Sequence, residues 1–327
     1  PPPPPPPPAA AVPVLRKYFF KRLFVAIPSL VIASVIVFSL VRLIPGDVVV
    51  LMMEENQYAD DLEAMRAKLG LDRPIYVQYF EWIGRALIGD LGESLYTRRP
   101  VAQELLARVP VSLELGAVAI FFAILLGVPI GIVSAVRQDT AQDYVARGGA
   151  ILGLSVPGFW LGTLVVVLPA IYFKWSPSIQ FTKLADDPWR HVAQFILPGL
   201  LLGIASAASI MRLTRTQLLE VLRQDYVRTA WSKGMSERMV VLKHSLKNAL
   251  IPVVTVLGIQ IAQVLSGTVI FESIFGLPGM GRFLFDAITE RDYPVIQGIN
   301  LVVVTTVVGV NLMVDFVYAY LDPRIRF

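Results

Sequence analysis

Long apolar stretches alternate with polar ones along this chain, and the apolar stretches have the length of membrane-spanning helices. About 20 mainly apolar residues cross the hydrocarbon layer of a bilayer as a helix. Six segments reach this length: 23–43, 113–136, 150–173, 194–213, 250–271 and 298–320. Several contain proline or glycine, which a bundle tolerates because neighbouring helices satisfy the freed backbone groups. The pattern predicts an all-α membrane protein with six spans, some of them kinked.

The charges that flank the first span set the predicted orientation. Four basic residues precede this span without an acidic neighbour: Arg16, Lys17, Lys21 and Arg22. This pattern is typical of a cytoplasmic N-terminus, and six spans then place the C-terminus on the same side. We expect the first span to be retained, because it is longer than the apolar part of a signal peptide. We assign no function to the proline run at 1–8 within the low-complexity, basic segment 1–22.

The polar stretch 44–112 is predicted to lie outside and to carry structure of its own, because it is too long for a simple turn. Capping and stop residues predict two short helices, at 60–69 and at 74–88. The second helix groups aromatic and apolar side chains: Tyr76, Tyr79, Phe80, Trp82 and Ile83. Such a helix suits either the bilayer interface or the surface of a partner protein.

The inner segment at 212–247 is amphipathic, with eight basic and three acidic residues and with apolar residues at helical intervals. It predicts two helices with a break between them. Gly234 is the expected stop of the first helix, and Ser236 is the expected N-cap of the second. An ordinary basic loop that only fixes topology is the alternative, but such a loop needs fewer residues. The pattern therefore favours docking to a cytoplasmic partner.

Composition narrows the classes of function. The chain is 55% hydrophobic and 17% charged, with mean hydropathy +0.63, no cysteine and two histidines. Disulfides, thiolate nucleophiles and cysteine-ligated metals are excluded, and we expect no metal site and no catalytic residue. No phosphate-binding loop, zinc-protease motif or nucleophile elbow occurs, so this chain is not by itself an ATPase of that type or a recognisable hydrolase. The net charge of +4 is modest for a nucleic-acid binder.

Polar residues within the apolar segments are candidates for a translocation path. Gln260, Gln263 and Asn300 could line a water-filled passage, or they could form hydrogen bonds between helices. Two glycine pairs with four-residue spacing permit close helix contact, which serves either folding or dimerisation: Gly127 with Gly131, and Gly199 with Gly203. An ion-coupled carrier usually needs a charged residue near the middle of the bilayer, and the apolar segments offer no convincing one. A channel or carrier that acts alone is therefore the less favoured class.

Several motifs together carry a family likeness. The stretches 225–234 (DYVRTAWSKG) and 246–254 (LKNALIPVV) resemble the cytoplasmic signature of ABC importer permeases, in the dipeptide/oligopeptide branch. The motifs IPGD at 44–47, LGLDRP at 69–74, GDLG at 89–92, FGLPGMG at 275–281, RDYP at 291–294 and DPRIR at 322–326 are similar to that branch as well. The general signature begins Glu-Ala-Ala, where this chain has Arg228, Thr229 and Ala230, followed by Gly234.

The resemblance implies a type I ABC importer bundle, with a permease core at 113–327 and a coupling segment at 214–249 that is seated on an ATPase. The implied docking residues are Asp225, Tyr226, Arg228, Thr229, Ala230, Lys233, Gly234, Met235 and Ser236. The implied partners are a second permease, two ATP-binding cassette subunits that hold ATP and Mg, an extracytoplasmic binding protein and the lipid bilayer. This chain would bind no cofactor and would lie in the bacterial inner membrane. The implied cargo is a di- or oligopeptide, or alternatively a nickel chelate, a glutathione-like compound or an oligosaccharide.

Overall fold

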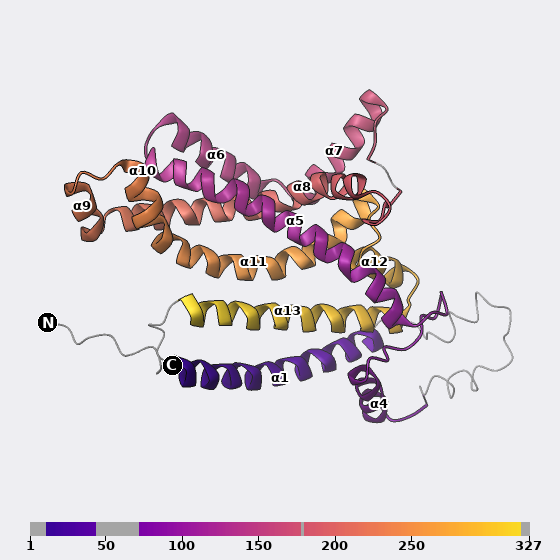
Figure 1. Cartoon of the computed structure of the whole chain (residues 1–327). Coiled ribbons are helices and arrows are strands. Elements are labelled where there is room, and N and C mark those ends of the chain that lie inside the picture. Colours follow the sequence, from indigo (N-terminus) through magenta and orange to yellow (C-terminus); the bar gives the residue numbers. More distant parts are fainter. Residues whose placement is uncertain (1–10, 44–71, 178–179, 322–327) are drawn as a thin grey trace. The chain divides into compact units, whose positions relative to one another are not determined.

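The computed structural model describes residues 11–43, 72–177 and 180–321, and these residues are mainly helical (Figure 1). The helices are α1 Ala11–Leu43, α4 Ile75–Leu87, α5 Val101–Val136, α6 Ala141–Ser155, α7 Gly158–Phe173, α8 Pro188–Leu222, α9 Asp225–Ser232, α10 Glu237–Met239, the π-helix η2 Val240–Ser245, α11 Leu246–Phe275, α12 Met280–Thr289 and α13 Tyr293–Leu321. The predicted helix at 60–69, the proline run and the C-terminal motif lie outside the described residues.

Five helices of the described part are long and apolar enough to cross a membrane, and two bent helix pairs could each supply one more span. The predicted third span at 150–173 lies across one of these pairs, α6 and α7, which meet at a bend of 90°. Val156 at the break is extended, with φ −88° and ψ 122°. The following Pro157 explains the break, because proline disfavours helical backbone in the residue before it. The six-span count remains a prediction.

Two compact units can be distinguished by their internal contacts. Of the described residues, one unit takes mainly those up to Arg108 together with Phe283–Leu312, and the other takes those from Val109 to Arg282 together with those from Met313 onwards.

In the second unit, glycines bring α5 and α8 into close contact. A Cβ atom added at Gly127 of α5 would lie 2.7 Å from the carbonyl oxygen of Ala207 on α8. One added at Gly203 of α8 would lie 2.5 Å from the carbonyl oxygen of Ala119 on α5. Atoms this close would overlap, so only glycine permits this separation of the two backbones. The spacing of small residues therefore serves folding within the chain.

The turn between α11 and α12 is held by a buried carboxylate. Gly276 ends α11 in the left-handed conformation, with φ 69°. The carboxylate of Glu272 accepts hydrogen bonds from Ser112 Oγ at 2.6 Å and from the backbone N–H of Arg282 at 2.9 Å. Ser112 Oγ in turn accepts from the N–H of Met280 at 2.8 Å. These side chains satisfy N–H groups that the first turn of α12 leaves unpaired.

In the first unit, α4 occupies most of the predicted helix at 74–88 and packs on α1. Tyr79 forms a hydrogen bond of 2.8 Å with Ser34 and contacts the ring of Phe38 edge-on at 5.3 Å. Other large apolar side chains of α4 remain exposed: Ile75, Tyr76, Phe80 and Leu87. Both alternatives for this helix, a lipid interface and a protein partner, stay open.

Candidate functional site

The segment at 225–236, here called the cytoplasmic segment for its predicted side of the membrane, follows α8 after two connecting residues. Its helix α9 has one buried face, formed by Val227 and Ala230. These side chains pack with Val240 and with Leu222 near the end of α8. The predicted docking residue Ala230 therefore supports α9 from inside and does not face outwards.

The other face of α9 is exposed and mixes charged, polar and aromatic side chains. Its members are Asp225, Tyr226, Arg228, Thr229 and Trp231. Arg228 lies 3.4 Å from Asp225, but both side chains are exposed, so this ion pair contributes little to stability. Tyr226 is 44% exposed, and its hydroxyl accepts a hydrogen bond of 2.8 Å from the amide of Asn248. Asn248 belongs to the sequence motif at 246–254, yet only the structure places it beside α9.

The break after α9 has the predicted form. The helix ends at Ser232, Lys233 is its C-cap, and Gly234 follows with φ +71°. A Cβ atom added at Gly234 would meet nothing within 4 Å, so the positive φ is what favours glycine here. Met235 packs half-buried against the buried face of α9. Ser236 is the N-cap residue of α10, although its side chain makes no capping hydrogen bond.

The connection from the cytoplasmic segment to α11 passes through a π-helix, which the sequence did not predict. Residues Val240–Ser245 form it, and Ser245 Oγ donates to the carbonyl oxygen of Val240 at 3.0 Å. The helix then continues as α11 with Pro252 inside it, so the predicted boundary at 250 is not a helix start. π-Helical turns are rare in proteins overall, but those that occur are often found at functional sites.

Two open cavities lie beside this region. One has a volume of about 400 Å³ and is lined by residues of α8 and of the link to α9: Arg215, Thr216, Leu219, Glu220, Arg223 and Gln224. The other measures about 290 Å³, and its lining includes Trp231, Glu237 and Val241. The second cavity places Trp231 at the edge of a recess next to the exposed face of α9.

The structure places the predicted path residues in different surroundings. Gln260 on α11 accepts a hydrogen bond of 3.0 Å from Ser206 on α8. Asn300 donates to the carbonyl oxygen of Ile296 in its own helix at 2.8 Å. The side chain of Gln263 lies outside the described part. The bond of Gln260 agrees with the helix-packing alternative, and the passage itself remains a prediction.

In the described part of the chain, no group of three or more His, Cys, Asp or Glu residues could hold a metal ion.

The sequence did not predict a contact between His191 and Glu114. The Nε2 atom of His191 lies 2.8 Å from the Oε2 atom of Glu114. His191 Nδ1 lies 2.8 Å from the carbonyl oxygen of Thr182. These contacts tie the start of α8 to α5 and to the chain before α8.

Comparison with known proteins adds independent information. The family described as "Binding-protein-dependent transport system inner membrane component" matches residues 127–327, and its N-terminal companion matches residues 15–116. The dipeptide transport system permease protein DppB of Escherichia coli K12 is 38% identical over 334 residues, covering 95% of this chain and 98% of that protein. DppB of Alkalihalophilus pseudofirmus is 40% identical over 330 residues, covering 95% and 99%.

A third relative is named for a different cargo. The glutathione transport system permease protein GsiC of Escherichia coli K12 is 41% identical over 310 residues, covering 95% of this chain and 99% of that protein. Among solved structures, an inward-facing MetNI methionine ABC transporter matches 67% of this chain and 97% of its own, with a TM-score of 0.56 and 17% identity. At that identity the likeness concerns the fold alone.

Proposed function

Since the chain belongs to the family of binding-protein-dependent transport system inner membrane components, we propose that it forms, with a second homologous permease, the passage of an ATP-driven importer for di- or oligopeptides. The names of the relatives support this cargo, because dipeptides and glutathione are both short peptides. A glutathione-like compound is the second candidate, since one relative at 41% identity carries that name. The protein is a multi-pass membrane protein, and we propose that both termini lie in the cytoplasm.

The cytoplasmic segment carries the proposal. Its buried face fixes α9 to α8 and η2, while its other face offers Tyr226, Arg228 and Thr229 to a partner. We propose that this face docks in a groove of an ATP-hydrolysing subunit, with Asp225, Lys233, Gly234, Met235 and Ser236 completing the contact. Charged groups at the rim of such an interface mainly set orientation and specificity, whereas the aromatic ring supplies buried area.

In this proposal two ATPase subunits hold ATP and Mg and carry out the hydrolysis, and an extracytoplasmic binding protein delivers the peptide. This chain performs no covalent step. Its contribution is a shift between an outward-open and an inward-open packing of the helices. To move such an equilibrium from 1:99 to 99:1, the docked partners must favour one packing by about 5.5 kcal/mol.

The proposal is tested by substitutions on the docking face, in the complex reconstituted with its partners. We expect Arg228→Glu and Gly234→Val to leave the protein inserted in the membrane, because both residues are exposed. Both should weaken retention of the ATPase subunits, or allow ATP hydrolysis without peptide uptake. Arg228→Glu reverses a charge at the contact, and Gly234→Val puts a β-branched residue at a positive φ.

Matched controls exist within the chain. Arg190 is also exposed and, like Arg228, lies close to an aspartate three residues earlier, at 3.5 Å against 3.4 Å, so Arg190→Glu controls for charge reversal. Gly148 is likewise open, with nothing within 4 Å of an added Cβ atom, so Gly148→Val controls for side-chain size. Normal ATPase retention and normal uptake in both docking-face variants would refute the assignment.

A further inference from the structure

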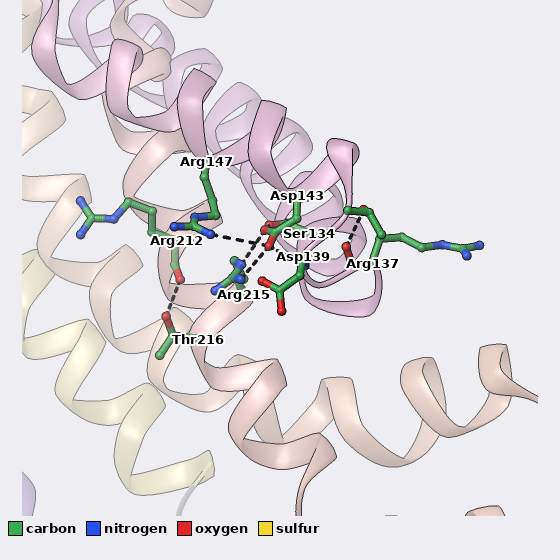
Figure 2. A network of polar contacts seen from close by, with 9 residues as sticks. Ser134, Arg137, Asp139, Asp143, Arg147, Arg212, Arg215 and Thr216 are labelled. Carbon is green, nitrogen blue, oxygen red and sulfur yellow. Dashed lines mark hydrogen bonds and ion pairs between the residues drawn. The ribbon is translucent and has the colours of Figure 1, made fainter.

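A buried carboxylate at the start of α6 binds the neighbouring α8. Asp143 is 0% exposed, and its two carboxylate oxygens accept hydrogen bonds of 2.8 Å each from Nε and Nη2 of Arg215 on α8. Figure 2 shows the two side chains pointing toward each other across the helix pair. The Nη1 atom of Arg147 lies 3.9 Å from Oδ2 of the same carboxylate. A bidentate pair of this kind fixes direction as well as distance.

The same carboxylate also binds α5 and the turn that follows it. Ser134 of α5 donates its hydroxyl to Oδ1 of Asp143, and the backbone N–H of Asp139 donates to Oδ2 at 3.1 Å. One side chain thus joins the end of α5, the α5–α6 turn, α6 and α8. The sequence separates Asp143 from Arg215 by 72 residues, so this joint is a product of the fold.

Small side chains continue the contact between α6 and α8 beyond the ion pair. Ala150 of α6 packs with Ala208 and Met211 of α8 in one buried cluster. Further along α6, a Cβ atom added at Gly153 would lie 3.5 Å from the Cβ atom of Ala208. These small side chains hold α6 against α8 along its length, from Asp143 to Gly153.

Arg215 lies on the same helix that carries the cytoplasmic segment. Two turns beyond it, Leu222 of α8 packs with Val227 and Val240, which hold α9. A displacement of α9 is therefore transmitted to α8 by apolar packing, and from α8 to α6 through Asp143. From α6 the chain continues, across the bend of 90°, into α7.

We propose that Asp143 and Arg215 are positioning residues for transport, whose ion pair makes α6 follow α8 when the docked cytoplasmic segment is displaced. The proposal rests on the function proposed above. Apolar packing alone would hold the helices together at a lower cost of desolvation, so a buried ion pair is poorly explained by stability. Its directionality explains it better, because the pair fixes the register of one helix against the other.

The test uses the complete importer in proteoliposomes, with ATP hydrolysis and peptide uptake measured on the same preparation. We expect Asp143→Asn and Arg215→Gln to assemble and to hydrolyse ATP, but to take up about tenfold less peptide per ATP, the order of a typical coupling between sites. Asp186→Asn and Arg212→Gln are the matched controls. Asp186 is exposed and lies outside this network, and the Arg212 side chain points away from Asp143 (Figure 2).

A disulfide separates the positioning role from a merely structural one. The native chain has no cysteine, and a Cβ separation of 3.5 Å suits a disulfide between Gly153→Cys and Ala208→Cys. In the wild-type background, we expect oxidation to leave uptake unchanged. In the Asp143→Asn background, oxidation should restore uptake per ATP and reduction should return it to the lowered level, because the covalent bond replaces the ionic one.

Three outcomes would overturn the proposal. The first is normal uptake per ATP in Asp143→Asn. The second is loss of uptake when the cross-link forms in the wild-type background, because transport would then require α6 to slide along α8. The third is loss of assembly in Asp143→Asn that the cross-link does not repair, which would assign the pair to packing only. Failure of the proposed function is distinct from all three, because the unmodified complex would then show no ATP-dependent peptide uptake.

Discussion

Gly203 offers a sharp test of the packing between α5 and α8. An alanine there would bring its Cβ atom to 2.5 Å from the carbonyl oxygen of Ala119. Alanine has no rotamer to change and the atom it meets belongs to the backbone, so the two helices themselves must separate. Overpacking of this kind costs about 1–3 kcal/mol. We therefore expect Gly203→Ala to lower the free energy of unfolding by that amount.

The assay is the melting temperature of the purified subunit in detergent, compared with that of Gly148→Ala. Gly148 is also helical, but an added Cβ atom there meets nothing within 4 Å. Alanine favours helix over glycine by up to about 1 kcal/mol, so this control should melt at the native temperature or above it. Equal melting temperatures for the two variants would refute the close contact between α5 and α8.

Two further predictions concern topology and the passage. Asp186 and Tyr96 are exposed, and a cysteine at either position should react with a membrane-impermeant thiol reagent added to intact cells. A cysteine at Ser236 should not react, and labelling there would overturn the predicted orientation. Gln260→Leu and Ser206→Ala remove the same hydrogen bond, so the passage assignment predicts a larger loss of uptake in Gln260→Leu, and equal uptake would assign Gln260 to helix packing.

The sequence predicts where helices lie better than where they end. Hydropathy located α5 and α8, but both helices extend beyond their predicted apolar segments, to Val101 and to Leu222. Hydropathy measures which residues suit lipid, whereas a helix continues into water as long as its backbone bonds are satisfied and no stop occurs. The break at Pro157 was visible as a proline, yet its angle of 90° depends on what α6 and α7 pack against.

The candidate site also combines features that the sequence predicts with features that it does not. Gly234 marked the end of α9 because a left-handed residue favours glycine, and this local rule needs no tertiary information. The π-helix at Val240–Ser245 follows no comparable residue rule. The pairing of Asp143 with Arg215 joins residues on different helices, 72 residues apart in the sequence. Contacts of this kind depend on the register between helices, which periodicity alone does not determine.

The three least exposed carboxylates of the described residues show why Asp143 differs from the others. Asp143 and Glu272 are 0% exposed and Asp292 is 2% exposed, and each accepts a hydrogen bond from a serine that lies outside its own helix. Glu272 and Asp292 are otherwise bound by backbone N–H groups of nearby turns, which suits a carboxylate that holds a fixed loop. Asp143 alone among these three takes a bidentate arginine from another helix. A bond between two helices matters most where those helices must move together, and α8 is the helix that leads directly into the cytoplasmic segment.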